Sequence, residues 1–98
     1  MAKANIIRQT ARFERTVKKL KPNQKANLDA AVRVIAENPE LGDKKQGVLS
    51  HIQVYKFKMV KQLALLAYHF DEGELVLELI SLGSHENFYR NLERQERW

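Results

Sequence analysis

Hydrophobic residues recur at helical spacing near the start of the chain. Phe13, Val17 and Leu20 stand four and three residues apart, which places them on one face of a short amphipathic helix. A short strand at residues 5–10 precedes this helix. The opening of the chain therefore predicts a strand followed by a helix.

A second helix is predicted after Pro22, because proline favours the first turn of a helix. Asn38-Pro39 and Gly42 end the helical pattern. The buried face of this helix comprises Leu28, Ala31, Val32 and Ile35. Two amphipathic helices joined by a tight break form a helical hairpin.

After Gly47 the pattern becomes that of β-strands, and residues 48–52 either add a short strand or lead irregularly into the next one. Residues 54–59 alternate, so that Tyr55, Phe57 and Met59 face one side of a strand and two lysines face the other. This alternation predicts a strand with one buried and one charged face.

Two nearly continuous apolar segments follow at residues 63–70 and 75–82. Such segments are typical of strands that are covered on both faces. The polar sequence at residues 71–74 is a turn signal between them. Gly83-Ser84 ends the sheet, and Ser84 can cap a last helix that runs towards Trp98.

The elements follow the order β-α-α-β-β-β-α. This order predicts an α+β fold with a mostly antiparallel sheet of four or five strands, an N-terminal helical hairpin and a C-terminal helix. A chain of 98 residues buries one core, so we expect a single domain over residues 1–98. The absence of cysteine excludes disulfides and thiolate nucleophiles.

Positive charge is concentrated in the first part of the chain. Residues 1–61 hold 14 of the 17 Lys and Arg and 5 of the 12 Asp and Glu, a balance of +9, whereas residues 62–98 hold 3 and 7, a balance of −4. This asymmetry favours a basic face that attracts RNA. Surface lysines that only keep the protein in solution would produce the same count.

No apolar stretch is long enough for a signal peptide or a membrane span, so we expect a soluble, cytoplasmic protein that does not bind a membrane. The sequence contains no phosphate loop, no dinucleotide loop and no local metal-ligand motif. We therefore expect no metal and no small-molecule cofactor.

Lys56 and Lys58 project from one side of a strand, where two ammonium groups can bind an RNA backbone and offset charge on a phosphate. His85 stands where a strand meets a helix N-terminus, which favours the neutral imidazole of a general base. Tyr89 follows one turn later and can position a base. A solvated strand face and a packing histidine are the alternative interpretations.

Further RNA contacts are expected from basic residues elsewhere in the chain. These are Lys44, Lys45, Lys61 and His51. His69 shares the strand face of apolar neighbours, so we interpret it as a structural histidine with a hydrogen-bond partner.

Short segments in a fixed order and spacing resemble the RelE/ParE toxins over nearly the whole chain. They are Arg12-Phe13-Glu14-Arg15, Lys18-Lys19-Leu20, Asn38-Pro39, Gly47, Tyr55-Lys56-Phe57-Lys58, Leu66-Ala67-Tyr68 and Leu79-Ile80-Ser81-Leu82-Gly83. The resemblance implies a microbial-RNase-like fold and a bacterial toxin that an antitoxin protein neutralises. In the RelE branch the toxin cleaves mRNA on the ribosome without a metal.

The resemblance also assigns roles to residues. Lys56 and Lys58 match the lysine pair of RelE, but Leu65 and His85 stand where RelE has arginines. His85 with Tyr89 is more similar to the YafQ branch, which has a histidine and an aromatic residue at this spacing. We therefore expect a metal-independent mRNA endoribonuclease that inhibits translation. A ParE-like inhibitor of DNA gyrase and an inactive antitoxin-binding protein are the alternatives.

Overall fold

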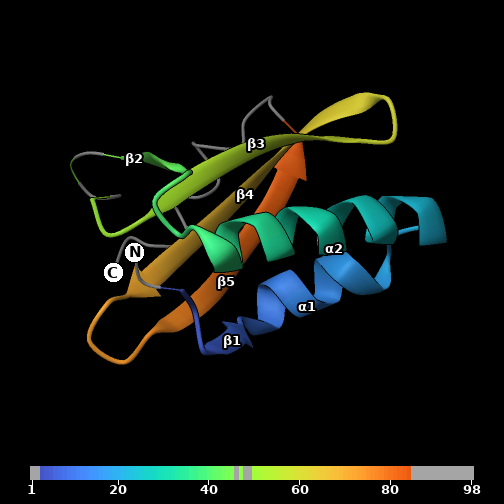
Figure 1. The fold of residues 1–98 in the computed structure, drawn as a ribbon. Helices are drawn as coiled ribbons and strands as arrows, with labels where there is room; N and C mark the ends of the chain where they lie inside the picture. The colour runs from blue at the N-terminus through green and yellow to red at the C-terminus, as the bar shows by residue number, and fades with distance from the viewer. Residues whose placement is uncertain (1–2, 46, 48–49, 85–98) are drawn as a thin grey trace.

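The computed structural model describes residues 3–45, 47 and 50–84. Its elements confirm an α+β fold, and the predicted C-terminal helix lies outside the described residues. The elements in chain order are β1 (Ile6–Gln9), α1 (Ala11–Lys18), α2 (Pro22–Glu37), β2 (Asp43–Lys44), β3 (Gln53–Met59), β4 (Gln62–Asp71) and β5 (Val76–Ser84). Figure 1 shows α1 and α2 side by side on one face of the sheet.

The five strands form one sheet in the order β1-β5-β4-β3-β2. All neighbouring pairs are antiparallel except β1 and β5, which run parallel. The sheet is therefore mostly antiparallel, as predicted. The additional short strand is β2 at residues 43–44, which pairs with the start of β3. The sequence suggested such a strand at residues 48–52, so β2 lies earlier in the chain than expected.

Hydrogen bonds at the helix starts follow from local sequence. The Thr10 hydroxyl accepts the amide N–H of Phe13 at 3.1 Å and donates to the Ile80 carbonyl at 2.7 Å, so it joins the start of α1 to β5. At the start of α2, the Gln24 side chain accepts the amide N–H of Lys21 at 2.8 Å, next to Pro22 in the first turn. Both contacts satisfy N–H groups that a helix N-terminus leaves unpaired.

The sheet is buried on both faces along its centre. The helix-side cluster includes Phe13, Leu28, Ile35, Leu66, Tyr68 and Leu77. The cluster on the opposite face comprises Ile52, Val54, Leu65, Ala67 and Ile80. Apolar residues at both parities of β4 therefore confirm the prediction of a central strand.

The edge strand β1 contributes little to the core. Ile6 and Ile7 are about half exposed, at 47% and 50%. Among the described strands, β1 pairs with β5 alone, so it lies at the margin of this sheet. The apolar residues that predicted this strand therefore stay partly in contact with solvent.

Tyr68 connects the sheet to the chain that follows α2. Its hydroxyl donates to the Pro39 carbonyl at 2.7 Å and accepts the amide N–H of Gly42 at 2.8 Å, and the side chain is fully buried. A Cβ atom on Gly42 would lie 2.6 Å from the tyrosine Oη. Gly42 therefore allows a close approach to Tyr68, whereas the helix already ends at Glu37.

We expect Tyr68→Phe to lower the free energy of unfolding by about 2 kcal/mol, because the Gly42 amide loses its acceptor and the Pro39 carbonyl keeps only the weaker of its two donors, the Gln53 amide. Urea denaturation measures the change. Tyr55→Phe is the matched control, since the Tyr55 hydroxyl makes no side-chain hydrogen bond to a described residue, and it should change stability by less than about 0.5 kcal/mol. Equal effects of the two variants would contradict this role of Tyr68.

Burial raises the pKa of Tyr68 above its ordinary value of 10.0. The folded protein keeps this proton at a pH where the unfolded chain loses it, so the free energy of unfolding is unaffected below about pH 10 and falls as the pH rises further. We expect Tyr68→Phe to show a shallower alkaline decline than the wild type. Urea midpoints measured between about pH 8 and pH 11 test this, and parallel declines would contradict it.

Candidate functional site

Lys56 and Lys58 are exposed on one face of β3. On the other face, the rings of Tyr55 and Phe57 stack with centroids 6.2 Å apart and pack against the helix-side core with Met59. Packing of this apolar face holds the strand in place, so the two ammonium groups project from a rigid backbone.

The neighbouring strand β4 places leucines beside these lysines. Lys58 pairs with Leu63, which is 44% exposed, and Lys56 pairs with Leu65, which is fully buried. Leu65 belongs to the buried cluster on this face of the sheet. No arginine occurs on β4 beside the lysine pair, so the positive charge at this position comes from β3.

Lys61 extends the basic surface to the turn between β3 and β4. This turn has two residues, and Val60 adopts φ 64°, a conformation that is rare for a β-branched residue. The Asn27 side chain accepts the Val60 amide N–H at 2.7 Å and so supports the turn from α2. A hollow of about 250 Å³ lies between this turn and the start of α2, with Lys21 and Lys61 in its wall.

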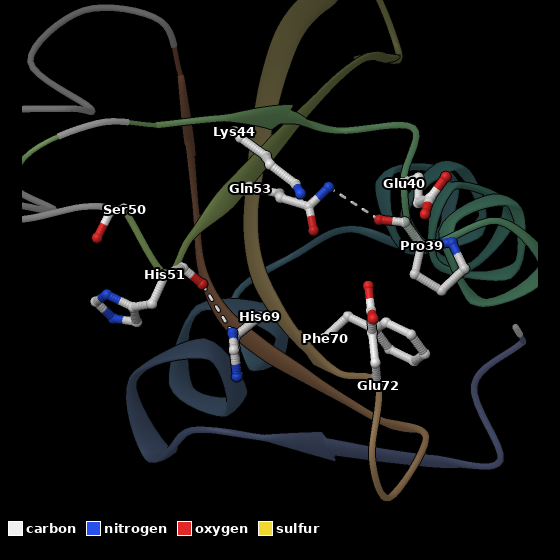
Figure 2. A pocket seen from close by; sticks show the side chains of 9 residues that line it. All are labelled: Pro39, Glu40, Lys44, Ser50, His51, Gln53, His69, Phe70 and Glu72. Atoms are coloured by element: carbon white, nitrogen blue, oxygen red, sulfur yellow. Dashed lines mark hydrogen bonds between the residues drawn. The ribbon is translucent and has the colours of Figure 1, made fainter.

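Lys44 and His51 lie at the opposite end of β3 from that turn. They line a second hollow of about 190 Å³, to which Gln53, His69, Phe70 and Glu72 also contribute (Figure 2). The amide N–H of Lys45 donates to the Ile52 carbonyl at 3.1 Å just outside this hollow. The basic residues expected to contact RNA therefore divide between the two ends of β3, with Lys61 at one end and Lys44, Lys45 and His51 at the other.

His69 makes the hydrogen bond expected of a structural histidine. Its Nδ1 lies 2.8 Å from the His51 carbonyl oxygen, and the two imidazole rings meet edge to face with centroids 6.1 Å apart. Because a carbonyl only accepts, Nδ1 carries the proton, and this leaves the lone pair of the neutral ring on Nε2.

His85 and Tyr89 lie outside the described residues. The described chain ends at Ser84, which pairs with Ala64, and Ala64 in turn pairs with Phe57 between the two lysines of β3. Neighbouring strands lie about 4.8 Å apart, so the backbone of Ser84 is about 10 Å from the lysine-bearing strand.

Several residues that line the two hollows have no recognisable signal in the sequence. Among them are Lys21, Glu40, Gln53, Phe70 and Glu72. They come from segments far apart in the sequence, and no local motif connects them. Within residues 3–45, 47 and 50–84, no three His, Asp or Glu side chains are grouped to hold a metal ion. No helix in that part of the chain is long and apolar enough to cross a membrane.

Comparisons with solved structures agree with this fold. The chain has a TM-score of 0.72 and 22% identity to a mutant of the E. coli toxin RelE in the free state, covering 99% of this chain and 98% of that one. It has a TM-score of 0.68 and 22% identity to a chain of the E. coli RelBE toxin–antitoxin complex, covering 85% and 99%. A chain of the Mycobacterium tuberculosis RelBE2 complex matches with a TM-score of 0.71 and 16% identity, covering 87% and 100%.

These structures define the fold class as that of RelE toxins. The family model of the ParE-like toxin of type II bacterial toxin–antitoxin systems matches residues 7–93. The chain therefore belongs to the ParE-like toxin family, within the RelE/ParE class of type II toxins. No curated protein matches the chain.

We expect Leu65→Arg to lower the free energy of unfolding by about 3 kcal/mol or more, because it places an unpaired charge in a fully buried position. Leu63→Arg is the matched control. Position 63 is exposed, so an arginine there keeps its guanidinium group in water, and the variant should change stability by less than about 0.5 kcal/mol. Urea denaturation compares the two. A Leu65→Arg protein as stable as the wild type would show that this position tolerates an arginine.

Proposed function

We propose that this toxin is an endoribonuclease that cleaves mRNA on the ribosome and so inhibits translation. The observation that carries the proposal is the pair of exposed ammonium groups, Lys56 and Lys58, on a strand whose other face is packed in the core. A preorganised pair of cations stabilises negative charge that develops on a phosphate in the transition state. The proposed site of action is the cytoplasm, where mRNA is translated.

In the proposed reaction, His85 takes the proton from a ribose 2′-hydroxyl, and the 2′-oxygen attacks the neighbouring phosphorus. The bond from phosphorus to the 5′-oxygen then breaks, which leaves a 2′,3′-cyclic phosphate, and the 5′-oxygen takes a proton from water to become a hydroxyl group. Lys56 and Lys58 hold the phosphate, and Tyr89 positions a base. The chain's own ammonium and imidazole groups supply this chemistry, so no metal has a role in it.

The end of β5 supports this assignment of His85. Ser84 pairs with Ala64 on β4, and Ala64 pairs with Phe57 on β3, the residue between the two lysines. Ser84 therefore lies at the level of the lysine pair, two strands away across the sheet. The backbone of Ser84 therefore lies about 10 Å from the strand that carries the lysine pair, a separation that side chains contacting one phosphodiester can span.

We also propose an antitoxin protein as the partner of this toxin. The relatives described above include toxins in RelBE complexes. An antitoxin segment with acidic residues would match the basic face around Lys56, Lys58 and Lys61. Binding there would block the approach of RNA.

A second candidate function is inhibition of DNA gyrase without hydrolysis, and the match to a ParE-like family model favours it. Such a binder has no need of a lysine pair together with a histidine. An inactive family member that only binds an antitoxin is the third candidate. Expression without an antitoxin separates the last case, because growth would continue.

We expect His85→Ala to reduce mRNA cleavage about 100-fold or more, the usual contribution of a general acid or base. Lys56→Ala and Lys58→Ala should each also reduce it, whereas Lys25→Ala, an exposed lysine on α2, should not. Mapping transcript ends after induction, and cleavage of ribosome-bound mRNA by purified protein, measure the effects.

The same purified proteins distinguish the rival function. Inhibition of supercoiling by gyrase, together with intact mRNA on ribosomes, would replace the ribonuclease proposal with the ParE-like one. Cleavage that is unchanged in folded His85→Ala protein would remove the assignment of that residue.

A further inference from the structure

The hollow at the β2 end of the sheet contains a combination of groups that the proposed cleavage reaction does not use. It has a volume of about 190 Å³, and its wall includes the ring of Phe70 and the buried Pro39 (Figure 2). Gln53 also lines it, and its amide nitrogen donates to the Pro39 carbonyl at 3.0 Å. This bond fixes the amide, so that its oxygen is left as an acceptor at the hollow.

Three charged side chains line the same hollow. Lys44 comes from β2, Glu40 from the segment after α2, and Glu72 from the turn after β4. None of the three forms an ion pair or a side-chain hydrogen bond with any residue that the structure describes. One donor and two acceptors therefore line a small cavity with an aromatic wall and remain available to a ligand.

A guanine base complements this set of groups. Its N1–H and N2–H₂ donors suit a carboxylate, which only accepts hydrogen bonds, and its O6 and N7 acceptors suit an ammonium group. The flat ring can stack on an aromatic side chain such as Phe70. Adenine and cytosine each offer a carboxylate only one amino group, so they match the hollow less well.

We propose that this hollow binds a guanine base of the RNA. The inference rests on the proposed function, because it assumes an RNA substrate. Gln53 and Lys56 are three residues apart on β3, about 10 Å along the strand, but the Gln53 side chain lies on the helix side of the sheet and Lys56 on the opposite side, so the hollow is reached from the end of the sheet. His69 shares the sheet face of Lys56 and also lines the hollow. One RNA strand held by the lysine pair can therefore place a nearby base in the hollow.

Binding of mononucleotides to the full chain tests the base site without any cleavage. We expect guanosine monophosphate to bind about tenfold more tightly than adenosine monophosphate or inosine monophosphate, since inosine lacks the N2 amino group. The Glu40→Gln/Glu72→Gln double variant should lose this preference. Lys44→Met should weaken the binding of guanosine monophosphate about tenfold. Glu74→Gln is the matched control, because this exposed residue lies in the same turn as Glu72 and does not line the hollow.

Equal affinities of the wild type for the three nucleotides would overturn the inference, and so would a guanine preference that survives in the double variant. The nucleotide comparison uses only wild-type protein, so it holds even if a variant fails to fold. Loss of antitoxin affinity in the double variant, without any guanine preference in the wild type, would assign the hollow to a protein partner and also overturn it.

The outcome is separable from that of the proposed function. Selective binding of guanosine monophosphate by a protein that leaves mRNA intact would remove the ribonuclease and keep the base site. Cleavage whose mapped positions show no enrichment of guanine, together with equal nucleotide affinities, would remove the base site and keep the ribonuclease.

Discussion

Seven residues of β3 pair with seven residues of β4 without a shift, from Gln53 opposite Tyr68 to Met59 opposite Gln62. This register decides which face of the sheet carries charge, because a slip of one residue would turn Lys56 and Lys58 into the helix-side core. Burial of the apolar face of β3 under the helices makes such a slip costly. The position of both lysines therefore depends on the buried side chains of the opposite face of β3.

Tyr68 extends this constraint to the chain that follows α2. Its hydroxyl binds the Pro39 carbonyl and the Gly42 amide, and a side chain at Gly42 would leave no room for it. Gln53 binds the same segment through the carbonyls of both residues. Pro39 and Gln53, two residues in the wall of the proposed base site, are thus held in place by hydrogen bonds to the sheet.

The positive charge of this toxin is arranged differently from what the resemblance to RelE implies, because RelE has an arginine at the position of Leu65. Leu65 is buried in an apolar cluster, so an arginine at this position would lose its hydration and lower the stability of the fold. On this part of the sheet the exposed cations lie instead on β3, as Lys56 and Lys58, and in the turn that follows it, as Lys61. Such a distribution suits an extended RNA strand that contacts several phosphates and one recognised base.

The sequence by itself determined the local structure, because strand alternation and helical spacing are properties of neighbouring residues. The outward direction of Lys56 and Lys58 follows from that alternation alone. Only the tertiary structure decided that β1 runs parallel to β5 and that Ile6 stays exposed. It also brought Lys44 and Glu72 to one hollow, since contacts between distant segments depend on how whole elements pack, and no local pattern records them.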